Sequence, residues 1–149
     1  MPCNTLHLLV DNIRRHIHIP FLSLIDITVK EIKEKNISQI ALLATGPTMD
    51  KGLYSNPLEK SGIKVLKPNR RQQENLNEIV IRLINGHQSY KDQEVVTAIL
   101  ESMKDQGAKS ILLACTDLHM LSFEEAGLEV IDTMKILAKA TAKEMLGDD

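Results

Sequence analysis

The sequence predicts an α/β domain with a mostly parallel sheet. Short apolar runs alternate with segments of helical periodicity, turn-forming residues separate them, and no low-complexity linker divides the chain. With 149 residues, of which 43% are hydrophobic, the chain carries enough apolar surface to bury a core. Ligands bind beyond the carboxyl ends of parallel strands, so the segments that follow the predicted strands are candidate sites.

The first part of the chain is expected to contain two helices and two strands. Residues 5–16 carry apolar side chains at a helical spacing. The apolar run 21–25 follows Pro20 and is interpreted as a buried strand. Residues 26–35 are expected to form a short helix with Asp26 or Thr28 as its N-cap, and residues 37–45 form the clearest strand of the sequence.

Shorter elements are expected to follow that strand. The Gly-Pro-Thr sequence at residues 46–48 indicates a loop. Residues 52–60 are interpreted as a short helix, and residues 63–66 as a strand that ends before Pro68.

The second half alternates two long helices with short strands. Residues 70–85 and 90–105 each place apolar side chains on one side at helical spacing, with a glycine near the end of each. Residues 109–114 and 128–131 are expected to be strands, and residues 133–145 a final helix. The side chains expected to face the core are Leu76, Ile79, Val80, Leu83 and Ile84 in the first long helix and Val95, Val96, Ile99, Leu100 and Met103 in the second.

Composition excludes several classes of protein. A formal net charge of −2 argues against a nucleic-acid-binding domain, and no basic face is patterned for a membrane surface. No apolar run approaches the roughly 18–20 residues of a membrane span, and the N-terminus does not have the layout of a signal peptide. The two cysteines are therefore interpreted as free thiols of a cytoplasmic protein.

Both cysteines stand in similar local sequences. Cys3 and Cys115 are each followed by Leu and His three and four residues later, and an Ile-Asp pair comes further on in both cases. This similarity suggests an internal duplication in which each half presents one thiol. The alternative interpretation, that both cysteines are small core residues, has about even odds on the pattern alone.

The residues that flank the cysteines favour a functional role. Asn4 and Thr5 follow the first cysteine and Thr116 and Asp117 the second, and all four are N-cap types. A thiol at a helix N-terminus has its thiolate form favoured, and the same position can hold a carboxylate. Two such thiols facing each other can remove a proton from one side of a carbon and return one to the other.

Other site chemistries fit the sequence poorly. There is no C-x-x-C pair, no Arg stands at phosphatase spacing after either cysteine, and residues 46–52 do not match a phosphate loop. No metal site is expected, because four histidines do not fall at a recognised zinc spacing: His7, His16, His18 and His119.

Five segments in order resemble the aspartate/glutamate racemase family. They are PCNTLH at residues 2–7, IPFLSLID at residues 19–26, LLATGPT at residues 42–48, ACTDL at residues 114–118 and VIDT at residues 130–133. The resemblance implies a fold of two lobes, each an α/β unit with a four-stranded parallel sheet flanked by helices, with the active site between them. Residues 1–25 and 128–149 would then be the remnant of an incomplete first lobe, and residues 26–127 the second lobe.

The resemblance also implies an activity. It is the racemisation of an acidic amino acid, aspartate before glutamate, by a homodimer that uses neither pyridoxal phosphate nor a metal. Cys3 and Cys115 would take a proton from Cα on one face and return one on the other. The donors to the substrate carboxylate would be Asn4, Thr5, Thr45, Thr48 and Thr116.

Three departures from the family keep alternatives open. The chain begins two residues before Cys3, where the family has a further βαβα region, and this predicts exposed apolar surface over residues 3–25 that a partner could cover. Asn85 stands where the family often has Lys, and Asp117 where Glu is usual. The alternatives are a catalytically impaired racemase fragment, or a decarboxylase or isomerase of the same fold.

Overall fold

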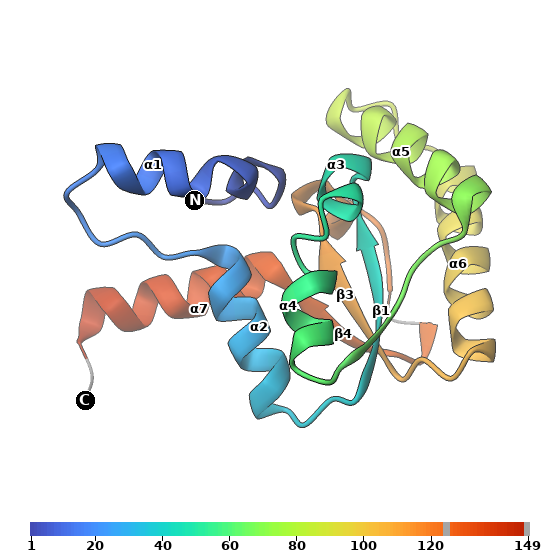
Figure 1. Cartoon of the computed structure of the whole chain (residues 1–149). Coiled ribbons are helices and arrows are strands. Elements are labelled where there is room, and N and C mark those ends of the chain that lie inside the picture. Colours follow the sequence, from blue (N-terminus) through green and yellow to red (C-terminus); the bar gives the residue numbers. More distant parts are fainter. Residues whose placement is uncertain (124–125, 148–149) are drawn as a thin grey trace.

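The computed structural model describes residues 1–123 and 126–147 and arranges them around one parallel sheet (Figure 1). The sheet has four strands in the order β2-β1-β3-β4, and all three neighbouring pairs are parallel. The strands are β1 (Gln39–Ala44), β2 (Lys64–Leu66), β3 (Ser110–Ala114) and β4 (Glu129–Asp132). This confirms the predicted α/β class and the positions of the strands expected at 37–45, 63–66, 109–114 and 128–131.

The two central strands explain why the apolar runs are continuous. Strands β1 and β3 pair from Ala41 with Ile111 to Ala44 with Ala114, and every residue of β3 is buried. Helices cover both faces of such a sheet, so residues on either face of a central strand must be apolar. The register also brings the carboxyl ends of β1 and β3 side by side.

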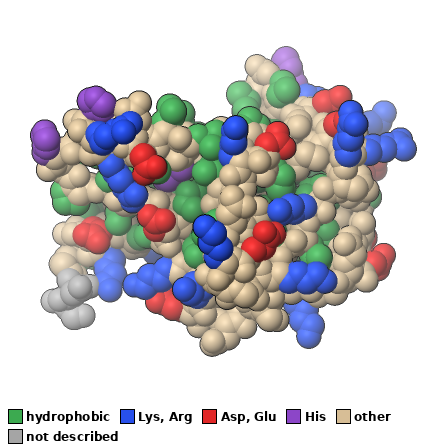
Figure 2. All heavy atoms as spheres, in the orientation of Figure 1, with side chains coloured by type: hydrophobic (Ala, Val, Ile, Leu, Met, Phe, Trp, Pro, Cys, Tyr) green, Lys and Arg blue, Asp and Glu red, His purple; other side chains and the backbone are tan. Residues whose placement is uncertain are grey.

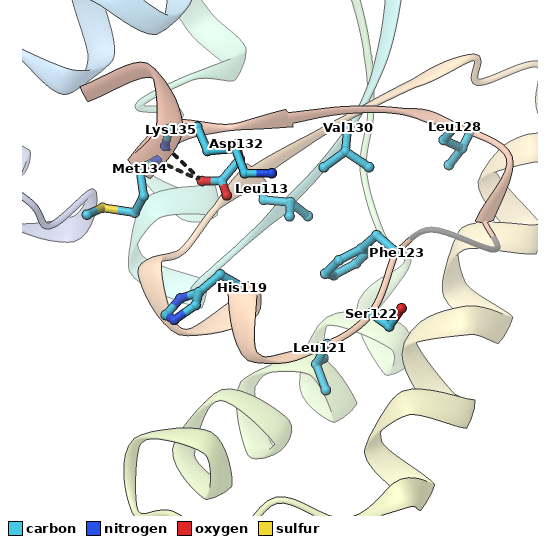
Figure 3. A pocket seen from close by; sticks show the side chains of 10 residues that line it. All are labelled: Leu113, His119, Leu121, Ser122, Phe123, Leu128, Val130, Asp132, Met134 and Lys135. Carbon is cyan, nitrogen blue, oxygen red and sulfur yellow. Dashed lines mark hydrogen bonds between the residues drawn. The ribbon is translucent and has the colours of Figure 1, made fainter. Parts of the chain in front are cut away.

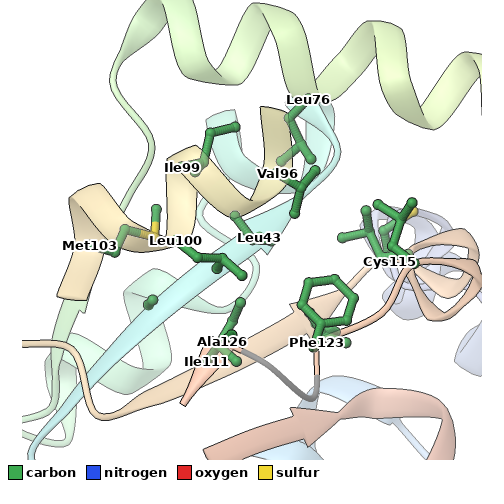
Figure 4. Packing of buried hydrophobic residues seen from close by; sticks show 14 of the residues in the cluster. Leu43, Leu76, Val96, Ile99, Leu100, Met103, Ile111, Cys115, Phe123 and Ala126 are labelled. Atoms are coloured by element: carbon green, nitrogen blue, oxygen red, sulfur yellow. The ribbon is translucent and has the colours of Figure 1, made fainter. Parts of the chain in front are cut away.

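Helices lie on both faces of the sheet (Figure 1). The elements are η1 (Thr5–Leu9), α1 (Val10–His16), α2 (Leu24–Glu34), α3 (Gly46–Asp50), α4 (Ser55–Lys60), α5 (Arg70–Ile84), α6 (Tyr90–Asp105), η2 (Thr116–Met120) and α7 (Thr133–Leu146). Helices α5 and α6 pack on one face of the sheet, where Leu43 and Ile111 meet residues such as Leu76 and Leu100 (Figure 4). On the other face, Ile40 and Leu42 share a cluster with residues of α2, α4 and α7.

The surface is mixed in charge. Lys and Arg side chains are interspersed with Asp and Glu over the face shown in Figure 2. Within residues 1–123 and 126–147, no helix has the length and apolar character needed to cross a bilayer.

Asp92 holds the beginning of α6 and ties it to α5. Its carboxylate accepts a hydrogen bond from the Ser89 N–H at 2.9 Å and forms an ion pair with the Arg82 guanidinium at 2.6 Å. The Asp92 side chain is 2% exposed, and the Arg82 hydrogen bonds keep the pKa of its carboxyl below the usual value. A buried carboxylate with these partners is a stabilising cap.

We expect Asp92→Ala to lower the free energy of unfolding by about 1–3 kcal/mol, because both the cap and the ion pair are lost. The measurement is urea unfolding followed by circular dichroism at neutral pH. Glu94→Ala removes an exposed carboxylate from the same helix and serves as the control. Equal destabilisation by the two substitutions would contradict a specific role for Asp92.

The strand expected over residues 21–25 is wrong, because this run leads into α2. Ser23, rather than Asp26 or Thr28, is the N-cap, and its Oγ accepts a hydrogen bond from the Asp26 N–H at 3.2 Å. Leu24, Thr28 and Ile32 recur every four residues and are all buried. A short apolar run suits either a strand or a buried helix, and the cap decides between them here.

Two further expectations are corrected. Residues 46–48 are not a loop but the beginning of α3, in which Pro47 occupies the first turn, where no intrahelical N–H bond is lost. Ile84, expected in the core, is 63% exposed, whereas the other four apolar residues predicted with it are buried. Helix α5 thus presents two large apolar side chains, Ile81 and Ile84, away from the main core.

The division into two lobes stays a prediction. Strand β4 comes from the segment 128–149 that we grouped with residues 1–25, and it pairs with β3 in the observed sheet. Residues 124–125 and 148–149, which fall within the two predicted lobes, lie outside the described residues.

Candidate active site

Three threonine hydroxyls meet where β1 ends. Thr5 Oγ1 lies 2.9 Å from Thr45 Oγ1 and 3.1 Å from Thr48 Oγ1, and Thr45 Oγ1 donates to Thr48 Oγ1 at 3.0 Å. Thr45 directly follows β1, and Thr48 lies in α3. Thr48 is 1% exposed, whereas Thr5 and Thr45 are half-buried. The fold therefore joins a residue near Cys3 to the loop after β1, as hydroxyls that can donate to an anion.

Asn4 anchors the segment around Cys3 to the sheet. Its Nδ2 donates to Thr133 Oγ1 at 3.2 Å, and Thr133 Oγ1 donates to the Leu113 carbonyl of β3 at 3.0 Å. The Tyr54 hydroxyl donates to Asn4 Oδ1. Burial raises the pKa of the Tyr54 phenol, which therefore remains a donor. Asn4 is 2% exposed with both polar atoms bonded, so its observed role is to hold residues 3–5 in place.

The same hydrogen bonds place residues 3–5 at the carboxyl end of the sheet, where Cys115 lies. Leu113, reached from Asn4 through Thr133, precedes Cys115 by two residues, and Cys115 follows the end of β3. Strands β1 and β3 are parallel neighbours, so the hydroxyl group of Thr45 and the thiol of Cys115 follow adjacent strand ends. Such carboxyl ends are the usual position of ligand sites in open α/β sheets.

His7 links Cys3 to the beginning of α2. The His7 Nε2 accepts a hydrogen bond from the Leu24 N–H at 2.9 Å, so the ring proton sits on Nδ1 and donates to the Cys3 carbonyl at 2.8 Å. His7 is 2% exposed, and burial lowers the pKa of its imidazole from the usual value. Only the neutral ring can make both bonds, because the charged ring has no acceptor.

We expect acid to destabilise the fold through His7. The pKa of His7 is lower in the folded chain than the unfolded value of 6.5. The stabilisation by the neutral ring is therefore present above pH 6.5 and is lost as the pH falls from there through the folded pKa. Between pH 7 and pH 5, His7→Gln should lose less stability than the wild type, by about 1 kcal/mol, in thermal unfolding followed by circular dichroism. His18→Gln, at an exposed position, should keep the wild-type loss, and the reverse pattern would contradict this role.

Cys115 is buried and is a thiol at neutral pH. Its side chain is 7% exposed, and the sulfur lies 3.7 Å from Asp117 Oδ2. Burial raises the pKa of the Cys115 thiol to about 11. The Asp117 backbone N–H lowers this pKa, whereas the charge of Asp117 and the hydrogen bond to its side chain raise it. The expectation that a helix N-terminus favours the thiolate at Cys115 is therefore wrong. Helix η2 is a 3₁₀ helix of five residues, and the desolvation of the thiol outweighs the effect of its N-terminus on the pKa.

The remaining predicted residues are placed as follows. Cys3 is half-buried and immediately precedes Asn4. Thr116 donates to Asp117 Oδ2 at 3.3 Å, and within the described residues no hydrogen bond joins it to the threonine group of residues 5, 45 and 48. Sequence reasoning did not single out Tyr54, His7 or Thr133 as positioning residues, although all three lie in or next to the segments that carry the family resemblance.

Two cavities lie near this end of the sheet. The larger, about 630 Å³, lies along β4 and is lined by none of the predicted site residues (Figure 3). Its Asp132 is occupied as the N-cap of α7, accepting from the N–H groups of Met134 and Lys135 at 2.8 and 3.4 Å. A smaller cavity of about 290 Å³ is lined by Thr5 and Thr45, and therefore adjoins the hydroxyl group.

The described part of the chain contains no candidate metal centre. There, no three His, Cys, Asp or Glu side chains are grouped as metal ligands. What the arrangement offers instead is two thiols, hydroxyl donors for an anion and a neighbouring cavity.

Comparisons with known proteins find relatives for both the sequence and the fold. Residues 1–141 match the family model described as Asp/Glu/hydantoin racemase. The broad specificity amino-acid racemase RacX of Bacillus subtilis is 28% identical over 147 residues, which are 98% of this chain and 63% of RacX. The chain therefore spans less than two thirds of the length of that relative.

This chain also covers about two thirds or less of the length of similar proteins with solved structures. A protein of Yersinia pestis described as an Asp/Glu racemase candidate superposes with a TM-score of 0.86 at 32% identity, over 97% of this chain and 64% of that one. An aspartate racemase homologue of Pyrococcus horikoshii superposes with a TM-score of 0.74 at 29% identity, over 93% of this chain and 64% of that one. A Picrophilus torridus aspartate racemase, at 24% identity and a TM-score of 0.82, shares the fold over 97% of this chain and 60% of its own.

Proposed function

Because the chain belongs to the Asp/Glu/hydantoin racemase family, we propose that it racemises an amino acid without a cofactor, with Cys3 and Cys115 on opposite faces of the substrate carbon. The observation that carries the proposal is the path of hydrogen bonds from Asn4 through Thr133 to Leu113. This path supports the assignment of both cysteines to one site, because it connects the residue after Cys3 to β3, the strand that ends just before Cys115.

The proposed reaction needs one thiolate and one thiol. The Cys3 thiolate takes the α-proton, so an S–H bond forms and the electron pair of the C–H bond passes to the substrate carboxylate. The Cys115 S–H then gives its proton to the other face of the carbon and becomes the thiolate. The protein ends with its proton on Cys3 and returns to the starting state by exchange with solvent. The high pKa of Cys115 suits its start as the acid.

The hydroxyls of Thr5 and Thr45 are proposed to donate to the substrate carboxylate, where charge develops when the α-proton leaves. The Thr45 hydroxyl would turn away from Thr48, its acceptor in this structure, when substrate binds. Thr48 is buried and bonds to both of them, so it orients the two hydroxyls rather than contacting substrate. Preorganised donors matter here because the α-proton of an amino acid is a very weak acid. Asn4 and Thr116 stay predicted donors.

The direct test is exchange of the α-proton with D₂O, followed by NMR for each enantiomer of a panel of amino acids that includes aspartate and glutamate. We expect exchange and inversion by the wild type, and neither by the double variant Cys3→Ala, Cys115→Ala. Wild-type exchange no faster than that of the double variant, for every amino acid, would reject the function.

We further propose that the chain self-associates through the apolar side chains of its first 25 residues. Leu6, Leu9 and Ile19 are 47%, 54% and 73% exposed, as expected for this segment. Exposed apolar surface of this kind is typical of sites that pack against a partner. Size-exclusion chromatography with light scattering is expected to give a dimer whose fraction rises with concentration. A monomer over the whole concentration range would contradict the homodimer and leave a fragment that does not associate.

A further inference from the structure

The cavity beside the threonine hydroxyls is lined by η1, α3 and α5. Thr5 and the segment 45–47 contribute to its lining together with Val80, Ile81 and Ile84 of α5. Its volume of about 290 Å³ is near the lower end of the roughly 300–1,000 Å³ of small-molecule sites. A group bound by the Thr5 and Thr45 hydroxyls would therefore have this cavity next to it.

The side-chain oxygen of Asn77 in the cavity wall is already engaged. Asn77 Oδ1 accepts from the Gly46 N–H at 3.0 Å and from Gln73 Nε2 at 2.9 Å. A Cβ on Gly46 would lie 3.2 Å from Asn77 Nδ2, so the glycine allows α5 to approach the end of β1 this closely. None of the residues that line this cavity in the described part of the chain is charged. A carboxylate placed here would lose water and gain no cation.

Helix α5 leaves two large apolar side chains at this cavity. Ile81 and Ile84 are 59% and 63% exposed, although a charged or polar residue would be expected on the outer side of an amphipathic helix. The neighbouring Asn85 is turned back on its own helix, with Nδ2 donating to the Ile81 carbonyl at 2.7 Å. The helix thus offers apolar surface, and no ion-pairing group, at the mouth of the cavity.

We propose that this cavity binds the side chain of the substrate and that it takes an uncharged, aliphatic side chain in preference to a second carboxylate. The inference rests on the proposed function and replaces the expectation of aspartate with a substrate of the leucine or norvaline class. Burying an aliphatic group against Val80, Ile81 and Ile84 is favourable, whereas a desolvated carboxylate without a partner is costly.

Two measurements on the full chain test this. The first is D₂O exchange of leucine, norvaline, aspartate and glutamate, in which we expect kcat/KM to be at least about tenfold higher for the aliphatic pair. The second is an NMR titration of the amide signals of Gly46 and Ile84 with leucine and with aspartate, which needs no turnover. We expect leucine alone to shift both signals.

A charge placed in the cavity should reverse the preference. We expect Ile84→Lys to raise the aspartate-to-leucine ratio of kcat/KM, and of affinity, by about tenfold or more. Ile81→Lys is the second variant, and Met145→Lys, at an 80% exposed position outside the cavity lining, is the control that should change neither ratio.

The outcomes separate the two proposals. Leucine that shifts the Gly46 and Ile84 signals but exchanges no proton would support the cavity assignment and overturn the racemase function. Binding that favours aspartate would overturn the cavity assignment, and proton exchange that favours aspartate would overturn it while leaving the racemase function standing. Failure of both amino acids to shift these signals, or an unchanged ratio in both lysine variants, would also overturn the cavity assignment.

Discussion

Replacing Cys115 by alanine is expected to abolish racemisation while one enantiomer still exchanges its α-proton with solvent. In this variant Cys3 can remove a proton from its own face and return a deuteron to the same face, so the label enters without inversion. Cys3→Ala should show the reciprocal pattern with the other enantiomer. Loss of a proton-transfer group costs about 10²–10⁴-fold in rate, so inversion should fall by that factor in both variants.

The reciprocal pattern distinguishes two facing thiols from a single essential one. Optical rotation follows inversion, and NMR in D₂O follows exchange, for each enantiomer of the best substrate. Ser61→Ala, at an exposed residue before β2 at the other end of the sheet, is the control and should behave as the wild type. Exchange of both enantiomers at equal rates in either single-cysteine variant would contradict the assignment of one thiol to each face.

Proton abstraction by Cys115 is expected to rise steeply with pH. In Cys3→Ala it is the one remaining thiol, since the chain has two cysteines, and its pKa is raised to about 11 by burial. The fraction of thiolate, and with it the exchange rate, should increase about tenfold per pH unit between pH 7 and pH 10. The double variant Cys3→Ala, Cys115→Ala is the control and should show no such rise.

Titration of the same variant tests the pKa without turnover. The ultraviolet absorbance of the thiolate in folded Cys3→Ala should reach half its final value near pH 11. Adding Asp117→Asn should move this midpoint to lower pH, because the Asp117 charge and its hydrogen bond both raise the pKa of the thiol. A midpoint at or below 9, the ordinary value, would contradict the dominance of burial.

The strands and long helices could be predicted because their signals are local and repeated. The four apolar runs became the four strands of the sheet, and α5 and α6 bury Leu76, Ile79, Ile99 and Met103 as their spacing predicts. The run at residues 21–25 misled because its apolar pattern is too short to separate a strand from a helix. Its Ser23 cap was the signal that the prediction did not use.

The site was predictable as a set of residues but not as a set of interactions. The motifs named Asn4, Thr5, Thr45 and Thr48, and the structure joins the three threonines. Nothing near Asn4 in the sequence indicates that Tyr54 and Thr133 would occupy its amide, because these partners lie 50 and 129 residues away. The same holds for His7, whose partner Leu24 lies in a segment expected to be a strand.

The sequence by itself determined the α/β class, the order of the strands along the chain and the family. Apolar periodicity and short motifs are properties of neighbouring residues, so they can be read without coordinates. Only the tertiary structure decided the protonation of Cys115, the partners of Asn4 and the apolar cavity beside Thr45. Each depends on which atoms from distant segments replace water around a group, and that exchange of water for protein sets both pKa values and binding preferences.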